Sequence, residues 1–278
     1  MTAIEVRGLR KGYRNIQAVA GIDLEIARGE VFALLGPNGA GKTTTVEILE
    51  GHRQRDGGTV SVLGQDPARA GRDWRARLGI VLQTATDAAE LSVLETVRHF
   101  AGYYPRPRQA EEVIDLCGLT EKARARVKSL SGGQRRRLDV ALGIVGTPEL
   151  VFLDEPTTGF DPEARRQFWS LIQKLAADGT TVLLTTHYLD EAEALADRVA
   201  VIARGEIVAQ GTPADLGGRA TAEATVRWVD GRGEHVVRTP VPTKLVTELA
   251  AEGGELAELT VRRPTLEDIY MDLIGATA

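Results

Sequence analysis

The segment Gly36–Thr43 constrains the fold of this chain more than any other feature. Its sequence, GPNGAGKT, has the glycine, lysine and threonine spacing of a phosphate-binding loop, or P-loop. The apolar run Val31–Leu35 precedes it, and a helical pattern carrying Val46 and Leu49 follows. The glycines let backbone N–H groups point at phosphate oxygens, and the helix N-terminus adds partial positive charge. A buried strand, a glycine-rich loop and a helix in this order predict an α/β fold.

The P-loop also indicates which residues contact phosphate. We expect Lys42 to reach the β- and γ-phosphates and the Thr43 hydroxyl to ligate Mg²⁺. The residues expected to bind nucleotide in this segment are Gly36, Pro37, Asn38, Gly39, Ala40, Gly41, Lys42, Thr43 and Thr44.

A second segment supplies two carboxylates. Leu150–Leu153 is continuously apolar, as expected for a buried strand, and Asp154 and Glu155 follow directly. Ligands bind at the carboxyl ends of strands in open α/β sheets. We expect Asp154 to hold Mg²⁺, directly or through water, and Glu155 to polarise an attacking water.

Other apolar runs extend the sheet. Thr181–Thr186 and Val199–Ala203 show little alternation, which suits strands buried on both faces of a parallel sheet. Ile4–Val6, Leu24–Ile26 and Thr59–Leu63 alternate better, which favours antiparallel or edge strands. The fold class that follows is α/β: a P-loop NTPase core with a mainly parallel sheet, helices on both faces and an antiparallel β subdomain.

The region from about 84 to 145 interrupts the strand series and is mostly helical in pattern. Ser92–Glu95 has the composition of a capping box, and Leu138, Ala141 and Leu142 form an apolar stripe. The arginines at 135–137 are expected to lie on a solvated face of that second helix. We predict a helical subdomain inserted into the α/β core.

The composition changes near residue 217, so we expect a main domain at 1–216 and a small α+β extension at 217–278. Ala224–Val229 and His235–Arg238 resemble short strands, and Lys244–Ala251 and Leu266–Ile274 resemble helices. About 60 residues give only a marginal core.

Charge and cysteine content restrict the function. The net charge is −5, which provides no basic footprint for nucleic acid, so we expect no nucleic-acid partner. Cys117 is the single cysteine, so an internal disulfide is excluded. No apolar run approaches the roughly 18 residues that cross a bilayer, and the first residues lack the apolar core of a signal peptide. A role at a membrane would require a separate spanning partner.

The sequence LSGGQ at 130–134 narrows the choice among P-loop NTPases. Followed by RRRLDVALGIV and then the acidic strand, it resembles the signature of ATP-binding cassette (ABC) ATPases. The resemblance covers about residues 3–216. It implies that Gln83 is the Q-loop glutamine, Asp161 the D-loop aspartate, His187 the switch histidine and Tyr13 the aromatic residue that stacks on adenine.

The resemblance also implies a homodimer with ATP and Mg²⁺ as cofactors. Two copies face head to tail, and each ATP lies between the P-loop of one copy and the signature of the other. The residues implied to complete the partner's site are Ser131, Gly132, Gly133, Gln134 and Asp161. The implied catalytic residues are Glu155, His187, Lys42 and Gln83, and the implied metal residues are Thr43, Gln83 and Asp154.

The segment PTLEDIYMDLIG at 264–275 is similar to a closing motif of daunorubicin-resistance-type ABC ATPases. That similarity implies an ATPase subunit at the cytoplasmic face of the cell membrane, bound peripherally to two copies of an integral membrane permease. The implied activity is export of a drug, antibiotic or lipid-like substrate. Two alternatives remain open, an importer ATPase and a soluble non-transport ABC ATPase.

Overall fold

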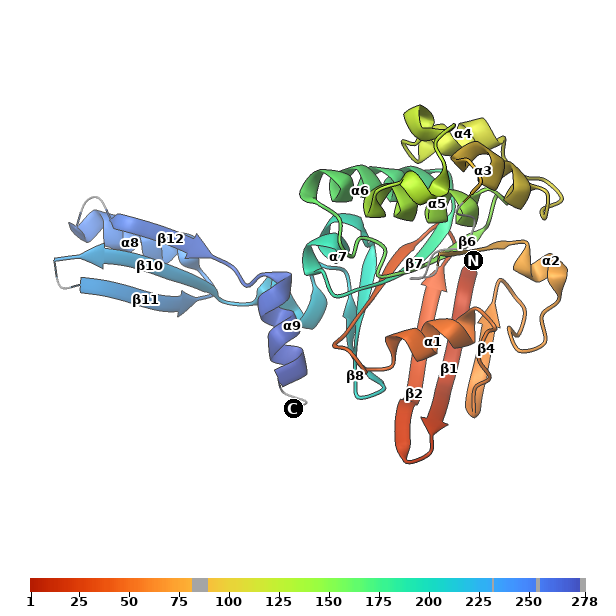
Figure 1. The fold of residues 1–278 in the computed structure, drawn as a ribbon. Helices are drawn as coiled ribbons and strands as arrows, with labels where there is room; N and C mark the ends of the chain where they lie inside the picture. The colour runs from red at the N-terminus through yellow and green to blue at the C-terminus, as the bar shows by residue number, and fades with distance from the viewer. Residues whose placement is uncertain (82–89, 232, 254–255, 276–278) are drawn as a thin grey trace. The chain divides into compact units, whose positions relative to one another are not determined.

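The computed structural model describes residues 1–81, 90–231, 233–253 and 256–275 (Figure 1). The chain forms two compact units, Met1–Val208 and Ala209–Ala278. The boundary between the two units lies within strand β9 (Glu206–Gly211), whereas the change in composition predicts it after residue 216.

A mainly parallel sheet forms the centre of the first unit. Within the described residues it has six strands in the order β5-β6-β7-β3-β8-β9. The strands besides β9 are β3 (Val31–Leu35), β5 (Leu78–Val81), β6 (Leu150–Asp154), β7 (Thr181–Thr186) and β8 (Arg198–Ala203). Every residue of β3 and β7 is buried, which explains why these sequences are continuously apolar or β-branched.

An antiparallel sheet lies beside it. Its order is β2-β1-β4, with β1 at Thr2–Tyr13, β2 at Ile16–Ala27 and β4 at Gly57–Val62. The short strands expected at Ile4–Val6 and Leu24–Ile26 lie within two twelve-residue strands. The remaining parts were not predicted, although they bury Leu9, Val19 and Ile22. The register is irregular between Val6 and Arg10, which breaks the alternation along β1.

The main core fills the space between the two sheets. Helix α1 (Lys42–Leu49) contributes Val46, Ile48 and Leu49, and β3 contributes Phe32 and Leu34. Buried residues of β1, β2, β4, β6 and β8 join the same cluster. Burial on this scale fixes the start of α1 against the end of β3.

Helices cover the opposite side of the parallel sheet (Figure 1). They include α5 (Gly132–Ile144), α6 (Pro162–Ala177) and α7 (Leu189–Leu195), which pack on β5, β7 and β3. Helices α3 (Val93–Ala101) and α4 (Ala110–Leu116) pack with α5 into the predicted helical subdomain. Short helical turns complete this unit at α2 (Arg72–Arg75), η1 (Thr120–Lys122) and η2 (Val127–Ser129).

The second unit is a small α+β module. Its sheet has the order β11-β10-β12, and its elements are η3 (Leu216–Thr221), β10 (Ala224–Asp230), β11 (Gly233–Thr239), α8 (Pro242–Gly253), β12 (Ala257–Arg262) and α9 (Leu266–Gly275). Strand β12 was not predicted, although Ala257, Leu259 and Val261 alternate with polar residues along it; all of its residues are exposed. No helix among the described ranges is both long and apolar enough to span a membrane.

Candidate functional site: a phosphate cradle beside two carboxylates

Three strand ends meet at one edge of the parallel sheet. Strand β7 lies between β3 and β6, and its register pairs Leu35 with Thr186 and Asp154 with Thr185. The P-loop after Leu35, the carboxylates at the end of β6 and His187 after β7 therefore emerge side by side. This is the edge where open α/β sheets bind their ligands.

Two glycines of the P-loop lie where no side chain fits. A Cβ on Gly36 would lie 2.3 Å from the carbonyl oxygen of Ile202, and a Cβ on Gly41 would lie 2.3 Å from that of Ala18. Gly41 also has a φ of 108°, which an L side chain rarely adopts, and it precedes the first residue of α1. The loop is thus pressed against β2 and β8, while Pro37, Asn38 and Gly39 are exposed.

Lys42 turns back onto the P-loop. Its ammonium donates to the carbonyl of Gly36 at 2.7 Å and to that of Pro37 at 3.2 Å. Burial lowers the pKa of Lys42, and the negative charges of Glu155 and Asp154 oppose that shift. A buried ammonium held beside two carboxylates at a helix N-terminus is suited to bind an anion.

The two carboxylates at the end of β6 share a partner on β7. The buried Thr185 hydroxyl donates to Asp154 Oδ1. The backbone N–H of Glu155 donates to the Thr185 carbonyl at 3.0 Å, and the Thr185 hydroxyl lies 3.2 Å from the same N–H. Thr185 was not singled out from the sequence. Its position beside Asp154 follows from the pairing register of β6 and β7, which the sequence alone does not give.

Glu155 and His187 face one another. His187 Nδ1 lies 3.3 Å from Glu155 Oε1, and the Thr158 hydroxyl lies 3.4 Å from Glu155 Oε2. The Glu155 side chain is mostly buried, whereas His187 is more exposed. This pair has the distances needed for a carboxylate that accepts a proton and an imidazole that orients it.

One buried arginine contradicts the sequence expectation. Residues 135–137 were predicted to lie on a solvated helix face, but Arg136 is only 9% exposed and donates to the carbonyls of Asp154 and Pro156. The prediction was wrong because α5 is buried on more than one face. Arg136 continues the four-residue spacing of the buried residues Val140 and Ile144, a signal that the sequence contained.

Glu50, which follows α1, is another residue near the site that was not identified from the sequence. Its side chain is buried, and burial raises its pKa to about 8, with further increases from the charges of Asp154 and Glu47. His52 Nδ1 lies 3.2 Å from Glu50 Oε2. The Glu50 carboxyl is therefore mostly neutral near neutral pH.

The signature residues form the start of α5. Ser131 accepts from the Gln134 N–H at 3.3 Å, and Gln134 Oε1 accepts from the Ser131 N–H at 3.1 Å, which is a capping box. Ser131 and Gly132 are exposed. The exposed helix start leaves backbone N–H groups available to a partner's ligand.

Asp161 has a structural contact of its own. It caps α6 by accepting from the Glu163 and Ala164 N–H groups, and these hydrogen bonds, the one from Ala164 above all, lower its pKa. Its side chain is exposed. The Q-loop residue Gln83 lies outside the described residues.

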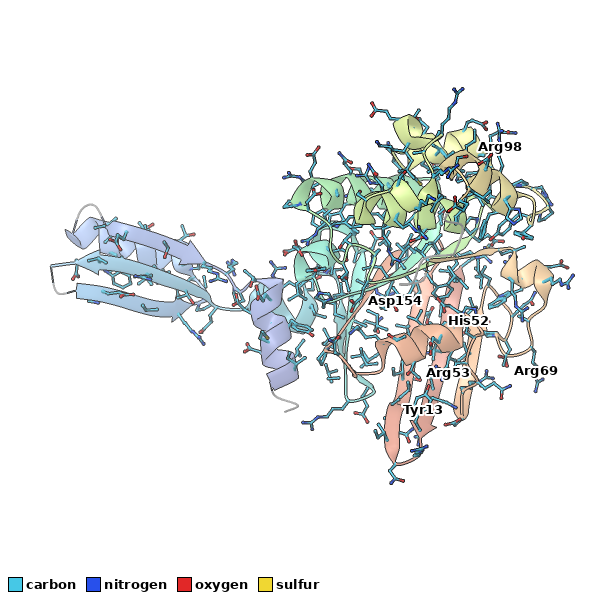
Figure 2. The ribbon with its side chains drawn as sticks, viewed as in Figure 1. Tyr13, His52, Arg53, Arg69, Arg98 and Asp154 are labelled. Atoms are coloured by element: carbon cyan, nitrogen blue, oxygen red, sulfur yellow. The ribbon has the colours of Figure 1, made fainter. Side chains whose placement is uncertain are left out.

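Tyr13 lies at the end of β1 and is 36% exposed. The guanidinium of Arg53 lies 5.3 Å from its ring centroid, and Lys11 Nζ lies 5.6 Å from it (Figure 2). Arg53 also contacts Glu47 on α1 at 2.5 Å, so Tyr13 is linked to the helix that follows the P-loop. Both cations lie over the ring, and an exposed aromatic ring offers a π-face on which a base can stack.

The residues present fit Mg²⁺ held together with phosphates. No group of three or more His, Cys, Asp or Glu suited to a metal occurs in the part of the chain that the structure describes. Mg²⁺ usually binds through one or two protein oxygens plus phosphates and waters. Asp154 and the exposed Thr43 supply such oxygens beside a P-loop that Gly36 and Gly41 allow to lie against β8 and β2.

Comparisons with known proteins agree with this geometry. The family model described as ABC transporter matches residues 19–158. The chain is 36% identical to the daunorubicin resistance ATP-binding protein DrrA3 of Streptomyces coeruleorubidus, over 99% of this chain and 96% of that one. It is also 36% identical to the Nod factor export ATP-binding protein I of Cupriavidus pinatubonensis, over 99% and 92% of the two chains.

Solved structures share the fold. An ATP-binding subunit of an ABC transporter superposes with a TM-score of 0.69 at 27% identity, covering 77% of this chain and 91% of that one. A dimeric post-hydrolysis state of the ATP-binding cassette MJ0796, bound to ADP and Pi, superposes with a TM-score of 0.68 at 24% identity. That match covers 75% of this chain and 98% of the other, and it supports the fold.

Proposed function

Because this chain belongs to the ABC transporter family, we propose that it is the ATP-hydrolysing subunit that drives export through a separate membrane permease. That the chain is an ATPase follows from the family itself. We further propose that the chain drives export, that it binds a permease, and that individual residues have the roles described below. The observation that carries the catalytic part is the 3.3 Å contact between Glu155 and His187 beside the P-loop.

The hydrolytic step uses charges already placed at the sheet edge. Water attacks the γ-phosphate in line, the bond from the γ-phosphorus to the bridging oxygen breaks, and ADP leaves. Glu155 accepts the proton of the water while His187 holds the carboxylate in position. Lys42 and the P-loop N–H groups stabilise the charge that develops on the phosphate oxygens. Tyr13 receives the adenine ring.

Thr43, Gln83 and Asp154 are the residues that would hold Mg²⁺. When bound, the ion would neutralise charge on the β- and γ-phosphates. Thr185 supports this role because its hydroxyl donates to Asp154 and fixes the carboxylate on the side facing β7. Asp154 therefore keeps an oxygen for the metal while it remains hydrogen bonded within the sheet.

Two copies of the chain are needed for a complete site. The exposed start of α5, with Ser131, Gly132, Gly133 and Gln134, supplies N–H groups and a hydroxyl for the γ-phosphate bound by the other copy. Asp161 lies at a second exposed helix start and acts across the same interface. ATP joins the copies, and hydrolysis lets them separate, which is the movement delivered to the permease.

Export is supported by relatives that match nearly the whole chain, including the second unit, and that are named for daunorubicin resistance and Nod factor export. The partner proposed is an integral membrane permease in two copies, with this chain at the cytoplasmic face of the membrane. The substrate class proposed is a drug, antibiotic or lipid-like molecule.

Affinity purification of the full chain from membranes of its own cells tests the partnership. We expect a polytopic membrane protein in equal amount, and recovery of the chain without any integral membrane protein would contradict the proposal. Inside-out vesicles from the same cells test direction, with daunorubicin as the probe. ATP-dependent accumulation that is lost with Lys42→Ala supports export, whereas ATP-dependent uptake into right-side-out vesicles would indicate an importer.

A further inference from the structure

The backbone at Glu155 has an unusual conformation. Its φ is 45°, in the left-handed region that residues with a Cβ adopt rarely. Such a conformation persists only where the surrounding structure holds it, and it occurs often at active sites. The direction of the Glu155 carboxylate depends on this backbone angle, because φ sets where the Cα–Cβ bond points.

One side chain contacts the peptides on both sides of Glu155. Arg136 Nη2 donates to the carbonyl of Asp154 at 2.7 Å, and Arg136 Nε donates to the carbonyl of Pro156 at 3.1 Å. The planar guanidinium presents its donors in a fixed geometry, so two bonds from one group restrain the distance between the two carbonyls. Thr185 restrains the Glu155 N–H from the other side, at 3.0 Å.

Arg136 reaches this position from the signature helix. Helix α5 begins at Gly132 with Ser131 as its cap, and Arg136 is buried on the side that faces the end of β6. A guanidinium is seldom buried unless it is paired, and here carbonyl oxygens and the nearby carboxylates of Asp139 and Asp154 provide the compensation. The Arg136 side chain therefore connects the signature helix α5 to the end of β6, where Glu155 lies, within one chain.

From this geometry we infer that Arg136 is a positioning residue, which holds the left-handed backbone of Glu155 and so aims its carboxylate at the attacking water. The inference rests on the proposed role of Glu155 as the general base. It assigns Arg136 no contact with the nucleotide, so its loss is expected to slow the chemical step and to leave nucleotide binding in place.

Steady-state ATPase measurements on the full chain test the inference. Met has a similar length but no donor, so Arg136→Met should lower kcat about 100-fold, as a small misplacement of a reacting group can. KM for ATP should change by less than about threefold, because the contacts that bind ATP in the ground state do not involve Arg136. Arg135→Met is the matched control on the same helix, since Arg135 donates to the carbonyl of Val127, which belongs to η2. Its kcat should stay close to that of the wild type.

A double variant separates positioning from a general structural role. If Arg136 acts through Glu155, adding Arg136→Met to Glu155→Gln should slow turnover no further. Additive losses would contradict the inference. Hydrogen exchange provides a readout apart from activity: Arg136→Met should speed exchange in peptides covering 154–160 and leave those covering Val31–Leu35 unchanged. Unchanged exchange at 154–160 would also contradict it.

Arg136→Lys covers the case in which the Met variant fails to fold. Lys keeps the charge, but its compact ammonium on a flexible stem cannot hold the two carbonyls at the fixed spacing of Nε and Nη2, so kcat should fall at least about 10-fold. A folded Lys variant with wild-type kcat would overturn the inference. If Glu155→Gln itself turns over at the wild-type rate, the proposed base is wrong. If Glu155→Gln is slow and Arg136→Met is not, only the role of Arg136 is wrong.

Discussion

His187 Nδ1 and Glu155 Oε1 lie 3.3 Å apart at the ends of neighbouring strands. In the proposed mechanism this contact orients the carboxylate that accepts the proton from water. His187→Ala should therefore lower kcat by about 10²-fold while ATP binding is retained. A steady-state assay of phosphate release measures kcat, and an equilibrium titration with ATP measures binding. Wild-type turnover in this variant would show that the contact has no part in the reaction.

Lys42 is expected to act on binding. Its ammonium is buried beside the P-loop carbonyls, and a charge-assisted hydrogen bond to phosphate contributes about 1.5–3 kcal/mol. Lys42→Ala should weaken ATP affinity about 10–100-fold, as measured by binding of a fluorescent ATP analogue. Affinity equal to that of the wild type would exclude a phosphate contact by this residue.

A variant of Thr185 tests whether its hydroxyl holds the end of β6, where Asp154 and Glu155 lie, in position. Thr185→Val keeps the shape of the side chain and removes the hydroxyl that donates to Asp154, so both turnover and stability should fall. The loss of a buried hydrogen bond costs about 1–3 kcal/mol, or roughly 2–4 °C in Tm for each kcal/mol. Thr181→Val is the control: it removes the acceptor of the Gly29 N–H at the other end of β7. It should lower Tm without lowering kcat.

Much of the fold was predictable because each core strand carries its own pattern. The strands of the parallel sheet are continuously apolar, and the P-loop lies where a strand and a helix pattern meet. Strand β12 is not continuously apolar: Ala257, Leu259 and Val261 alternate with polar residues, and all of its residues are exposed. The outer halves of β1 and β2 were missed although they bury Leu9, Val19 and Ile22, because the irregular register of the pairing breaks the alternation there.

The site was predictable where a motif fixes a residue type. Lys42, Asp154 and Glu155 were identified from their motifs, and the structure brings them to one sheet edge. Thr185 and Arg136 were missed because their roles depend on the register of β7 and on the packing of α5. The roles assigned to all of these site residues, and those assigned to Tyr13, Gln83 and Asp161, remain predictions.

Glu50 should make stability depend on pH. Its pKa is raised from 4.5 to about 8 in the folded chain, so the folded state holds the proton more tightly than the unfolded state. The stabilisation is complete below about pH 4.5 and is lost as the pH rises toward 8. Glu50→Gln cannot ionise, so at pH 9, without nucleotide or Mg²⁺, its Tm should exceed that of the wild type by about 2–4 °C.

Thermal melts of both proteins from pH 5 to pH 9 measure this effect. The difference in Tm should shrink toward pH 5, where Glu50 is neutral in the wild type as well. A difference that stays constant across this range would show that ionisation of Glu50 is not the cause.

Mixing two inactive variants tests the central claim, that each ATP is bound by the P-loop of one copy and the signature of another. Lys42→Ala disables one half-site and Ser131→Arg the other, so each variant alone should be inactive. In a mixed dimer one site combines both defects and the other has none. Random pairing should therefore restore about a quarter of wild-type turnover, since about half of the dimers are mixed and each has one intact site of two. Turnover no greater than the sum of the separate variants would contradict the shared site.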